Sequence, residues 1–426
     1  MSRPIVRNLC VCVSLLFFNF AVYAQGESLE NQAAIDLSEA LERTMAKNPD
    51  LSVFGYQIEA AEGVLQQAGP APNPELAVEV EDVLGTDDFS GVERAQTIVT
   101  LGWVLERSRR QRRIDAANAN VSLNTVDVEI MRLDVAAQTA RLFVICLAYQ
   151  GRLINGGEAV SQAQETVEAV RVRVAASRAL EADLARAEAE LARAELVEED
   201  YEHELLSAYH RLAAQWGQTQ PDFNSVRGDL STLPVAEAFE TLLASVEKNP
   251  ELARFMSQQR LDETELELVQ ERAKPSWRVY TGLRRIGFTD DIVLVGGISV
   301  PLAVRNRNQG QISEARANLA RTEAETTAAR VRVKTSLYVL YQEFLHSLHL
   351  AERLSNDVVP RLERALTDTQ RAYELGRYSY LEWSVVQAEL LEANNDLLEA
   401  SVDAHQIIIE IERLTGERFT LPTPNQ

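Results

Sequence analysis

Apolar residues recur every three to four positions along most of this chain, and this period predicts long amphipathic helices. In the run 307–374 the only glycine is Gly310 and the only proline is Pro360. A helix of nearly seventy residues would extend about 100 Å, at 1.5 Å per residue. We expect Pro360 to kink this helix locally. A heptad-like seam runs along it in steps of four and three: Leu337, Tyr341, Phe344, Leu348 and Ala351.

The first half contains a matching helical run at 108–174, in which Gly151, Gly156 and Gly157 predict a looser middle. Each long run is followed by a second segment with its own apolar face, which we interpret as a return helix. The residues that predict these two seams are Leu184, Leu191, Leu205 and Leu212 in the first half, and Leu381, Val385, Ala388, Leu398 and Val402 in the second.

A short interruption separates the long helix of the second half from its return helix. Gly376 can take the left-handed conformation that ends a helix. Ser379 and Glu382 have the S-x-x-E form of a capping box, which begins a new helix. A single rod through this point would be about 150 Å long, so we interpret the break as a hairpin tip rather than a hinge. Its counterpart in the first half is 175–181, with Ala175 at the place of Gly376.

Two other regions alternate apolar and polar residues with a period of two, which indicates β-strands. We predict one hairpin at about 74–105 and another at about 276–301, with polar loops at 85–91 and 287–291. Strands of roughly ten residues have the length that crosses a bilayer when tilted. An ordinary soluble hairpin is the alternative. The alternation is imperfect and does not say which face would meet lipid.

Short stretches recur in the same order in both halves, which indicates an internal duplication. Residues 47–51 (KNPDL) return as 248–252 (KNPEL), each after a short amphipathic helix and before a longer one. We therefore divide the chain into a first repeat, a second repeat and a tail: 25–235, with a long helical hairpin at about 108–216; 236–416, with a long helical hairpin at about 307–415; and 417–426.

The first 24 residues have the features of a secretory signal peptide. Arg3 and Arg7 precede an apolar run, and Val22-Tyr23-Ala24 suits cleavage after Ala24. Cleavage would leave Cys146 as the only one of three cysteines, so no internal disulfide is expected. We expect Cys146 to be a small buried apolar residue.

The chain has 64 acidic and 42 basic residues, a balance that argues against nucleic acid as a partner. The charges alternate with apolar residues at helical spacing, so we expect solvated helix faces. After residue 24 no run of apolar residues is long enough for a transmembrane helix. No catalytic triad, phosphate-binding loop or CxxC pair is present, so we expect neither an enzyme nor a cofactor.

One cluster among the five histidines suggests metal binding. Glu343, His346, His349 and Glu352 follow one another at i,i+3 spacing, which places them on one helix face. Imidazole and carboxylate groups are ligands for zinc or copper. A solvated coiled-coil face accounts for the same residues, and we expect His203 and His210 to be surface residues.

These motifs together resemble the outer-membrane factor family, the TolC-like exit ducts of bacterial tripartite efflux systems. The resemblance covers nearly the whole mature chain and rests on the duplicated plan and on the motif Tyr373-x-x-Gly376-x-x-Ser379-x-x-Glu382. It also rests on the stretch 300–310, VPLAVRNRNQG, which is similar to the strand-to-helix turn of the CzcC-like, heavy-metal branch. The residues of that turn are Pro301, Arg305, Asn306, Asn308 and Gly310.

The resemblance implies a mainly α fold with a small β part. Three copies would form a 12-stranded β-barrel in the outer membrane of a Gram-negative bacterium, joined to an α-helical barrel in the periplasm. Residues 219–235 and the N-terminal segment would form a belt around the helices, and Trp103, Trp277 and Tyr280 would join an aromatic girdle or pack ordinarily. The implied partners are outer-membrane lipid, a periplasmic adaptor and an inner-membrane pump.

The resemblance also implies a gate at the hairpin tips. Family members narrow this entrance with acidic residues just after the turn, where Glu382 stands, and Tyr373 matches a tyrosine that helps to hold the closed state. Val385 replaces a second acid that some members carry. Gly376 and Ser379 shape the turn, and Glu181 and Asp183 are the candidates in the first repeat.

Two other functions remain open from the sequence. The chain could be an exported soluble coiled-coil scaffold, or a periplasmic metal-binding protein that uses His346 and His349. For the efflux duct, the cargo could be a heavy-metal cation, a drug or an organic solvent.

Overall fold

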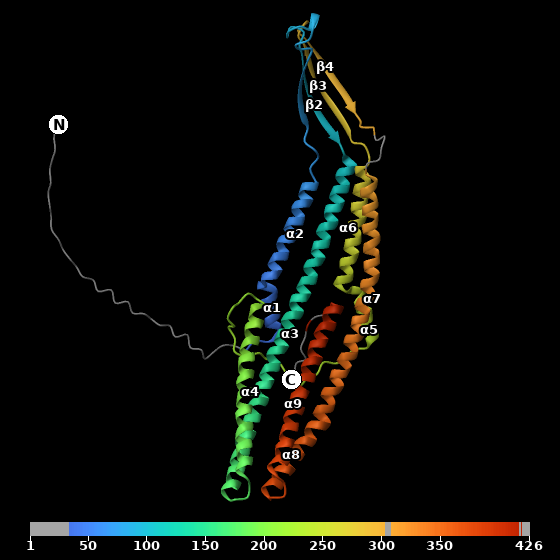
Figure 1. The fold of residues 1–426 in the computed structure, drawn as a ribbon. Coiled ribbons are helices and arrows are strands. Elements are labelled where there is room, and N and C mark those ends of the chain that lie inside the picture. Colours follow the sequence, from blue (N-terminus) through green and yellow to red (C-terminus); the bar gives the residue numbers. More distant parts are fainter. Residues whose placement is uncertain (1–33, 303–307, 417–418, 420–426) are drawn as a thin grey trace, which may run out of the picture.

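The computed structural model describes residues 34–302, 308–416 and 419 of the chain. It is elongated, with a small sheet at one end and two helical hairpin tips at the other (Figure 1). The predicted signal peptide, Arg305, Asn306 and all of the predicted tail except Phe419 lie outside the described residues. The helices are α1 (Leu37–Lys47), α2 (Pro49–Ala68), α3 (Arg107–Ala175), α4 (Glu181–Ala214), α5 (Phe239–Ser245), α6 (Pro250–Arg272), α7 (Gln309–Arg353), α8 (Val359–Glu374) and α9 (Tyr380–Thr415).

Helix α3 is continuous over 69 residues, so the looser middle expected from its glycines is wrong. Those glycines instead allow neighbouring helices to approach closely. A Cβ atom on Gly151 would lie 3.1 Å from Leu398 of α9, and one on Gly156 would lie 3.3 Å from the Tyr201 ring of α4. The helical hydrogen bonds of α3 and its tertiary contacts outweigh the weak helix propensity of glycine.

Helices α7 and α8 form the second long helical run, and a π-helical turn at Leu354–Val358 joins them. Pro360 follows this turn directly. Proline lacks the N–H that an α-helix needs, so the expected local break takes the form of a wider turn. The predicted seam is confirmed, because Leu337, Phe344 and Ala351 are buried and Tyr341 and Leu348 pack against the same core.

The repeated KNP motif joins the two ends of each repeat. Asn48 accepts a hydrogen bond from Leu51 N at the start of α2 and donates one to the carbonyl of Gln215 at the end of α4. Asn249 does the same in the second repeat, where its side chain caps α6 and donates to the carbonyl of Leu414, 2.6 Å away. Each asparagine therefore fixes the start of one helix against the end of another.

The four strands form one antiparallel sheet in the order β1-β2-β3-β4. The sheet combines one hairpin from each repeat, because β2 pairs with β3. β1 is shorter than expected, and a 3-10 turn at Asp87–Phe89 lies in its connection to β2. The strands are β1 (Glu75–Glu81), β2 (Gln96–Leu105), β3 (Trp277–Ile286) and β4 (Asp291–Ser299).

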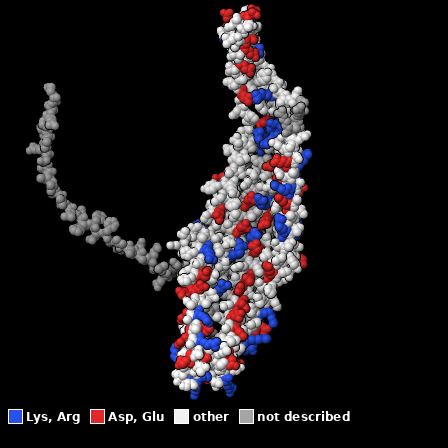
Figure 2. Space-filling view, in the orientation of Figure 1, with Lys and Arg blue, Asp and Glu red and all other residues white. Residues whose placement is uncertain are grey.

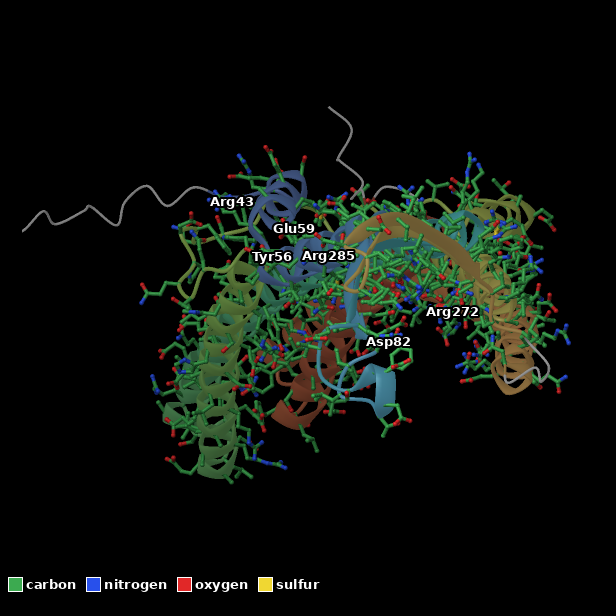
Figure 3. The ribbon with its side chains drawn as sticks, turned by 90° about the horizontal axis from the view of Figure 1, so that it is seen from above. Arg43, Tyr56, Glu59, Asp82, Arg272 and Arg285 are labelled. Carbon is green, nitrogen blue, oxygen red and sulfur yellow. The ribbon has the colours of Figure 1, made fainter. Side chains whose placement is uncertain are left out.

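The helices form a curved wall when seen from above, with α4 in one arm, α6 and α7 in the other and α9 between them (Figure 3). α3 contacts both α4 and α9 and so lies between the two hairpins. One core surrounds the middle of α3, where Ile35 pairs with Val226 and where Cys146 is fully buried, as expected. None of the described helices has an apolar stretch long enough to span a membrane.

Charged side chains of both signs alternate along the helical part, as the sequence predicted (Figure 2). Acidic side chains gather at the free end of the sheet in the same view. Asp82, Asp87 and Asp88 lie in the connection between β1 and β2. The helical faces are therefore solvated, while the loops of the sheet carry a local negative charge.

Candidate gate at the tips of the helical hairpins

The tip of the second repeat turns the chain back on itself between α8 and α9. Gly376 has φ +72°, the left-handed conformation expected of it. The backbone N–H of Ser379 donates to Glu382 Oε2 at 2.7 Å, and the backbone N–H of Glu382 donates to Ser379 Oγ at 3.4 Å. Both halves of the capping box are therefore formed. The hydrogen bond from the Ser379 backbone lowers the pKa of Glu382.

The tip of the first repeat has the same shape with different residues. Ser177, with φ +56°, takes the left-handed position, so Ser177 corresponds to Gly376 and the alignment of Ala175 with Gly376 is wrong. Asp183 accepts a hydrogen bond from the backbone N–H of Leu180 at 3.3 Å, as Glu382 does from Ser379. Glu181 is exposed at the first position of α4. Each tip therefore presents a carboxylate at the third position of its return helix.

Tyr373 occupies a different place from Glu382, in a buried cluster that joins the two hairpins. Its ring stacks on Trp383 with centroids 5.0 Å apart, and both residues are buried. Arg173, at the end of α3, joins this cluster, and its guanidinium lies 4.4 Å from the centroid of the Tyr373 ring. Arg173 also donates to the backbone carbonyl of Tyr373. Burial raises the pKa of Tyr373, so its hydroxyl stays protonated at neutral pH.

Three buried polar atoms in this cluster have no hydrogen-bond partner among the described residues: the Tyr373 hydroxyl, the Trp383 indole nitrogen and Arg173 Nε. A buried polar group without a partner destabilises the conformation that holds it by about 1–3 kcal/mol. Aromatic stacking, the cation–π contact and the burial of apolar side chains such as Val170 offset that cost.

Sequence reasoning missed Arg173 and Trp383 and assigned the wrong face to the start of α9. Leu381, Val385 and Ala388 are exposed, whereas Tyr380, Trp383 and Leu390 are buried. Both sets have helical spacing, and the predicted seam included the aliphatic set rather than the one with aromatic residues. The weight that large aromatic side chains carry in cores would have favoured Tyr380 and Trp383.

The strand-to-helix turn is described in part. Pro301 is exposed, and the Asn308 side chain donates to the carbonyl of Val269 at 2.6 Å, which ties the start of α7 to the end of α6. Gly310 lies in the first turn of α7, with open space around the position of a Cβ atom. Asn308 therefore helps to position the start of α7. At Gly310, packing within this chain does not require a glycine.

The sheet register resolves the two faces that the sequence left undecided. One row of paired residues crosses all four strands with apolar side chains: Val78, Val99, Leu283 and Leu294. Their exposed fractions are 62%, 41%, 55% and 77%, so this face is open. Trp103 and Trp277 lie on the same face, and Tyr280 lies on the opposite one.

The opposite face of the sheet carries charged side chains among apolar ones such as Ile98 and Val293. Arg278 donates to Glu75 at 2.7 Å, and Arg284 lies 4.0 Å from Glu81. Glu79 stands on the same face, next to Ile98 in the register. A sheet with one open apolar face and one charged face is suited to separate lipid from water.

The histidine cluster does not form a metal centre. His346 and His349 are both exposed on α7. Among the described residues, no group of three or more His, Cys, Asp or Glu side chains is arranged to hold a metal ion. His203 and His210 are also exposed, as expected, and His210 contacts the Thr219 carbonyl.

Comparisons with known proteins agree with this geometry. The profile of the family described as "Outer membrane efflux protein" matches residues 40–218. The cobalt-zinc-cadmium resistance protein CzcC of Cupriavidus metallidurans is 28% identical over 424 residues, covering 97% of this chain and 100% of that protein. The nickel-cobalt-cadmium resistance protein NccC of Alcaligenes xylosoxydans xylosoxydans is 24% identical over 329 residues, covering 75% of this chain and 73% of that protein.

The fold is similar to that of solved outer-membrane proteins. The crystal structure of VceC from Vibrio cholerae has a TM-score of 0.72 at 17% identity, covering 90% of this chain and 97% of that one. The family consists of efflux proteins rather than enzymes, which confirms the expectation that this chain is not an enzyme. The chain is therefore similar in sequence to outer membrane efflux proteins and shares its fold with the outer-membrane protein VceC.

Proposed function

We propose that this chain is the outer-membrane exit duct of a tripartite efflux system and that its cargo is a divalent heavy-metal cation. It works as a homotrimer, receives cations from an inner-membrane pump through a periplasmic adaptor, and performs no chemistry. The observation that carries the proposal is the sheet, which has one apolar face, one charged face and two outer strands, β1 and β4.

The outer strands favour a trimer over a single chain. In lipid, unpaired backbone N–H and C=O groups cost several kcal/mol each, so β1 and β4 need partners. Each chain supplies four strands, and three copies would close a ring of twelve. The apolar row that includes Val99 and Leu283 would then face lipid, and the row with Glu79 and Arg284 would line the lumen.

The same face argues against a soluble scaffold. Leu76, Val78 and Leu294 are each more than half exposed, and they belong to one continuous face of the sheet. A protein released into the periplasm would expose a large apolar patch there, which soluble proteins rarely do. Lipid supplies the missing contact.

Negative charge supports a cation as cargo. The chain has a net charge of −22, and each hairpin tip presents a carboxylate, Glu382 or Asp183, with Glu181 nearby in the sequence. In a trimer these groups would form rings at the narrow entrance, which attract cations by focusing the electric field. The names of the relatives CzcC and NccC include cobalt, zinc, nickel and cadmium and support the same class of cargo.

The buried cluster at the tips would hold the entrance closed. Tyr373 contacts Arg173 of the first hairpin and Trp383 of its own return helix, α9, and Gly376 and Ser379 form the turn between α8 and α9. The unpartnered Tyr373 hydroxyl would gain a hydrogen bond when the tips separate. An adaptor that separates the hairpins would have to break the cation–π contact and the hydrogen bond that Arg173 makes with Tyr373. The turn from Pro301 to Gly310 would join the membrane part to the helical barrel.

A metal-tolerance experiment tests the proposal. The gene is expressed in a strain that has the matching adaptor and pump but lacks its own duct. We expect restored tolerance to cobalt, zinc or cadmium, a detergent-requiring trimer in the outer membrane, and a mature N-terminus at Gln25. A monomer released by osmotic shock would contradict the duct, and restored tolerance to drugs or solvents without metal tolerance would contradict the cargo.

A further inference from the structure

A groove lies between α3, α4 and α9 on the side of the helices nearer the tips. Its volume is about 440 Å³, within the range of about 300–1,000 Å³ that is typical of small-molecule sites. It contains the residues that the sequence placed wrongly in a seam, Leu381, Val385 and Ala388. These side chains are not packed against another helix but form one wall of the groove.

Small residues and a polar link between helices form the floor of the groove. Ala159 and Ala163 of α3 line it, and their short side chains leave space between α4 and α9. The Gln387 side chain donates to Thr166 Oγ1 at 2.9 Å and holds α9 against α3 at this point. The floor is therefore fixed while the walls stay apart.

The apolar wall is open to solvent. Leu381 is 53% exposed and Val385 is 46% exposed. Two large aliphatic side chains in a concave site are a favourable surface for an apolar molecule, because burying them releases water from both partners.

One end of the groove carries charged side chains, among them an arginine without an ion-pair partner among the described residues. Glu190 is paired with Arg193 at 2.7 Å, but Arg186 has no ion pair with any residue that the structure describes. Burial raises the pKa of Tyr380, the charges of Glu190 and Asp183 raise it further, and the charge of Arg186 lowers it, so Arg186 is the cation that acts on this hydroxyl. Of the three charged residues in the lining, Arg186 is the one that forms no ion pair with a described residue.

We propose that this groove binds an amphipathic organic anion. The apolar part of the ligand, an aromatic ring system or an alkyl chain, lies on Leu381, Val385 and Ala388. Its carboxylate or sulfonate pairs with Arg186 beside the Tyr380 hydroxyl. This site goes beyond a duct for metal cations, because a hydrated cation would gain nothing from an apolar wall and would be repelled by Arg186.

Two fluorescent probes with the same skeleton test the proposal. The trimer in lipid nanodiscs is titrated with 1-anilinonaphthalene-8-sulfonate, which carries a sulfonate, and with N-phenyl-1-naphthylamine, which does not. We expect both to bind. Arg186→Gln should weaken binding of the sulfonate about tenfold, since a hydrogen bond to a charged group contributes about 1.5 kcal/mol, and should change the neutral probe less than twofold.

Two further variants fill the groove from the same helix. Ala388→Trp and Ser384→Trp should each reduce the binding of both probes more than tenfold, and circular dichroism and trimer yield report whether the variants fold. The matched controls are Ala328→Trp and Arg332→Gln, at exposed positions of α7 away from the groove, and they should bind both probes as the unsubstituted protein does.

The proposal is overturned by any of three results. Failure of both probes to bind the trimer would mean that another copy or a partner helix covers the groove. Unchanged binding in folded Ala388→Trp and Ser384→Trp would place the probes elsewhere. An equal effect of Arg186→Gln on the two probes would remove the anion preference. None of these results depends on metal transport, so they test the groove separately from the proposed function as a duct, which the metal-tolerance experiment tests.

Discussion

The guanidinium of Arg173 lies 4.4 Å from the centroid of the Tyr373 ring, so a cation from the first repeat covers an aromatic side chain from the second. The same ring stacks on Trp383 at 5.0 Å. The three residues come from α3, α8 and α9 and meet where the two hairpins end. Together with the apolar side chains of the same buried cluster, they link the two tips.

Replacing Arg173 should favour the open entrance. Arg173→Gln removes the cation–π contact, which contributes about 1 kcal/mol at a half-buried site. That loss shifts the equilibrium between closed and open tips about fivefold toward open in each chain. Single-channel conductance in planar bilayers measures the effect. The conductance of Arg173→Lys should lie between those of the unsubstituted protein and Arg173→Gln.

Arg171→Gln provides the control for Arg173. Arg171 is exposed on the same helix and pairs with Glu168 at 2.9 Å, a surface ion pair of little energetic value. The conductance of the Arg171→Gln trimer should equal that of the unsubstituted trimer. If Arg173→Gln and Arg171→Gln gave the same conductance as the unsubstituted trimer, the stack would have no part in closure.

Glu382 has two roles that a pair of variants can separate. Glu382→Gln keeps a side chain that can complete the capping box but removes the charge, so it should lower the preference for cations, measured as a reversal potential, and leave closure intact. Glu382→Ala removes both and should also raise the conductance at rest. Equal reversal potentials in the three proteins would exclude Glu382 from cation selection.

The same residue predicts an acid response. The hydrogen bond from the Ser379 backbone lowers the pKa of Glu382 in the folded tip relative to the unfolded chain. Stability from this group is therefore present above the unfolded pKa and is lost as the pH falls through the lower, folded pKa. The preference of the unsubstituted trimer for cations should therefore fall only below the usual titration range of glutamate, and this fall should be absent in Glu382→Gln.

The sequence predicted the hairpins because local rules determine them. Gly376 and Ser379 act through their own backbone and cap, and alternation in β1 to β4 is a property of each strand alone. Packing between distant segments was harder to infer. The glycines of α3 suggested a break, but Gly151 is required by Leu398, which lies far away in the chain.

The candidate gate was predicted only in part for the same reason. Tyr373 and Glu382 follow from a motif, whereas Arg173 reaches Tyr373 from the other repeat. The face of α9 was misjudged because its apolar residues satisfy two helical stripes, and only the position of α3 selects Tyr380 and Trp383 for burial. Information of that kind is absent from the local pattern.

Asn249→Ala should destabilise the second repeat. Asn249 is 1% exposed, caps α6 and donates to the Leu414 carbonyl at 2.6 Å. Loss of the cap and of a buried hydrogen bond costs about 2 kcal/mol, and the lower melting temperature can be followed by circular dichroism at a fixed heating rate. Asn118→Ala, at an exposed position of α3, is the control and should not lower it. Equal melting temperatures for the two variants would show that the repeated KNP motif has no structural role.

Adjacent residues of β2 should respond oppositely to the same charge. Leu101 belongs to the open apolar face and is paired with Leu76, whereas Thr100 lies on the face with the charged side chains, opposite Gly282. An arginine on the lipid side of a barrel costs about 2–4 kcal/mol at the middle of the bilayer. Leu101→Arg should therefore greatly reduce heat-stable trimer in outer-membrane fractions, while Thr100→Arg should retain it. Trimer retained in Leu101→Arg but lost in Thr100→Arg would reverse the assignment of the two faces, and equal amounts in both would contradict insertion of this sheet into lipid.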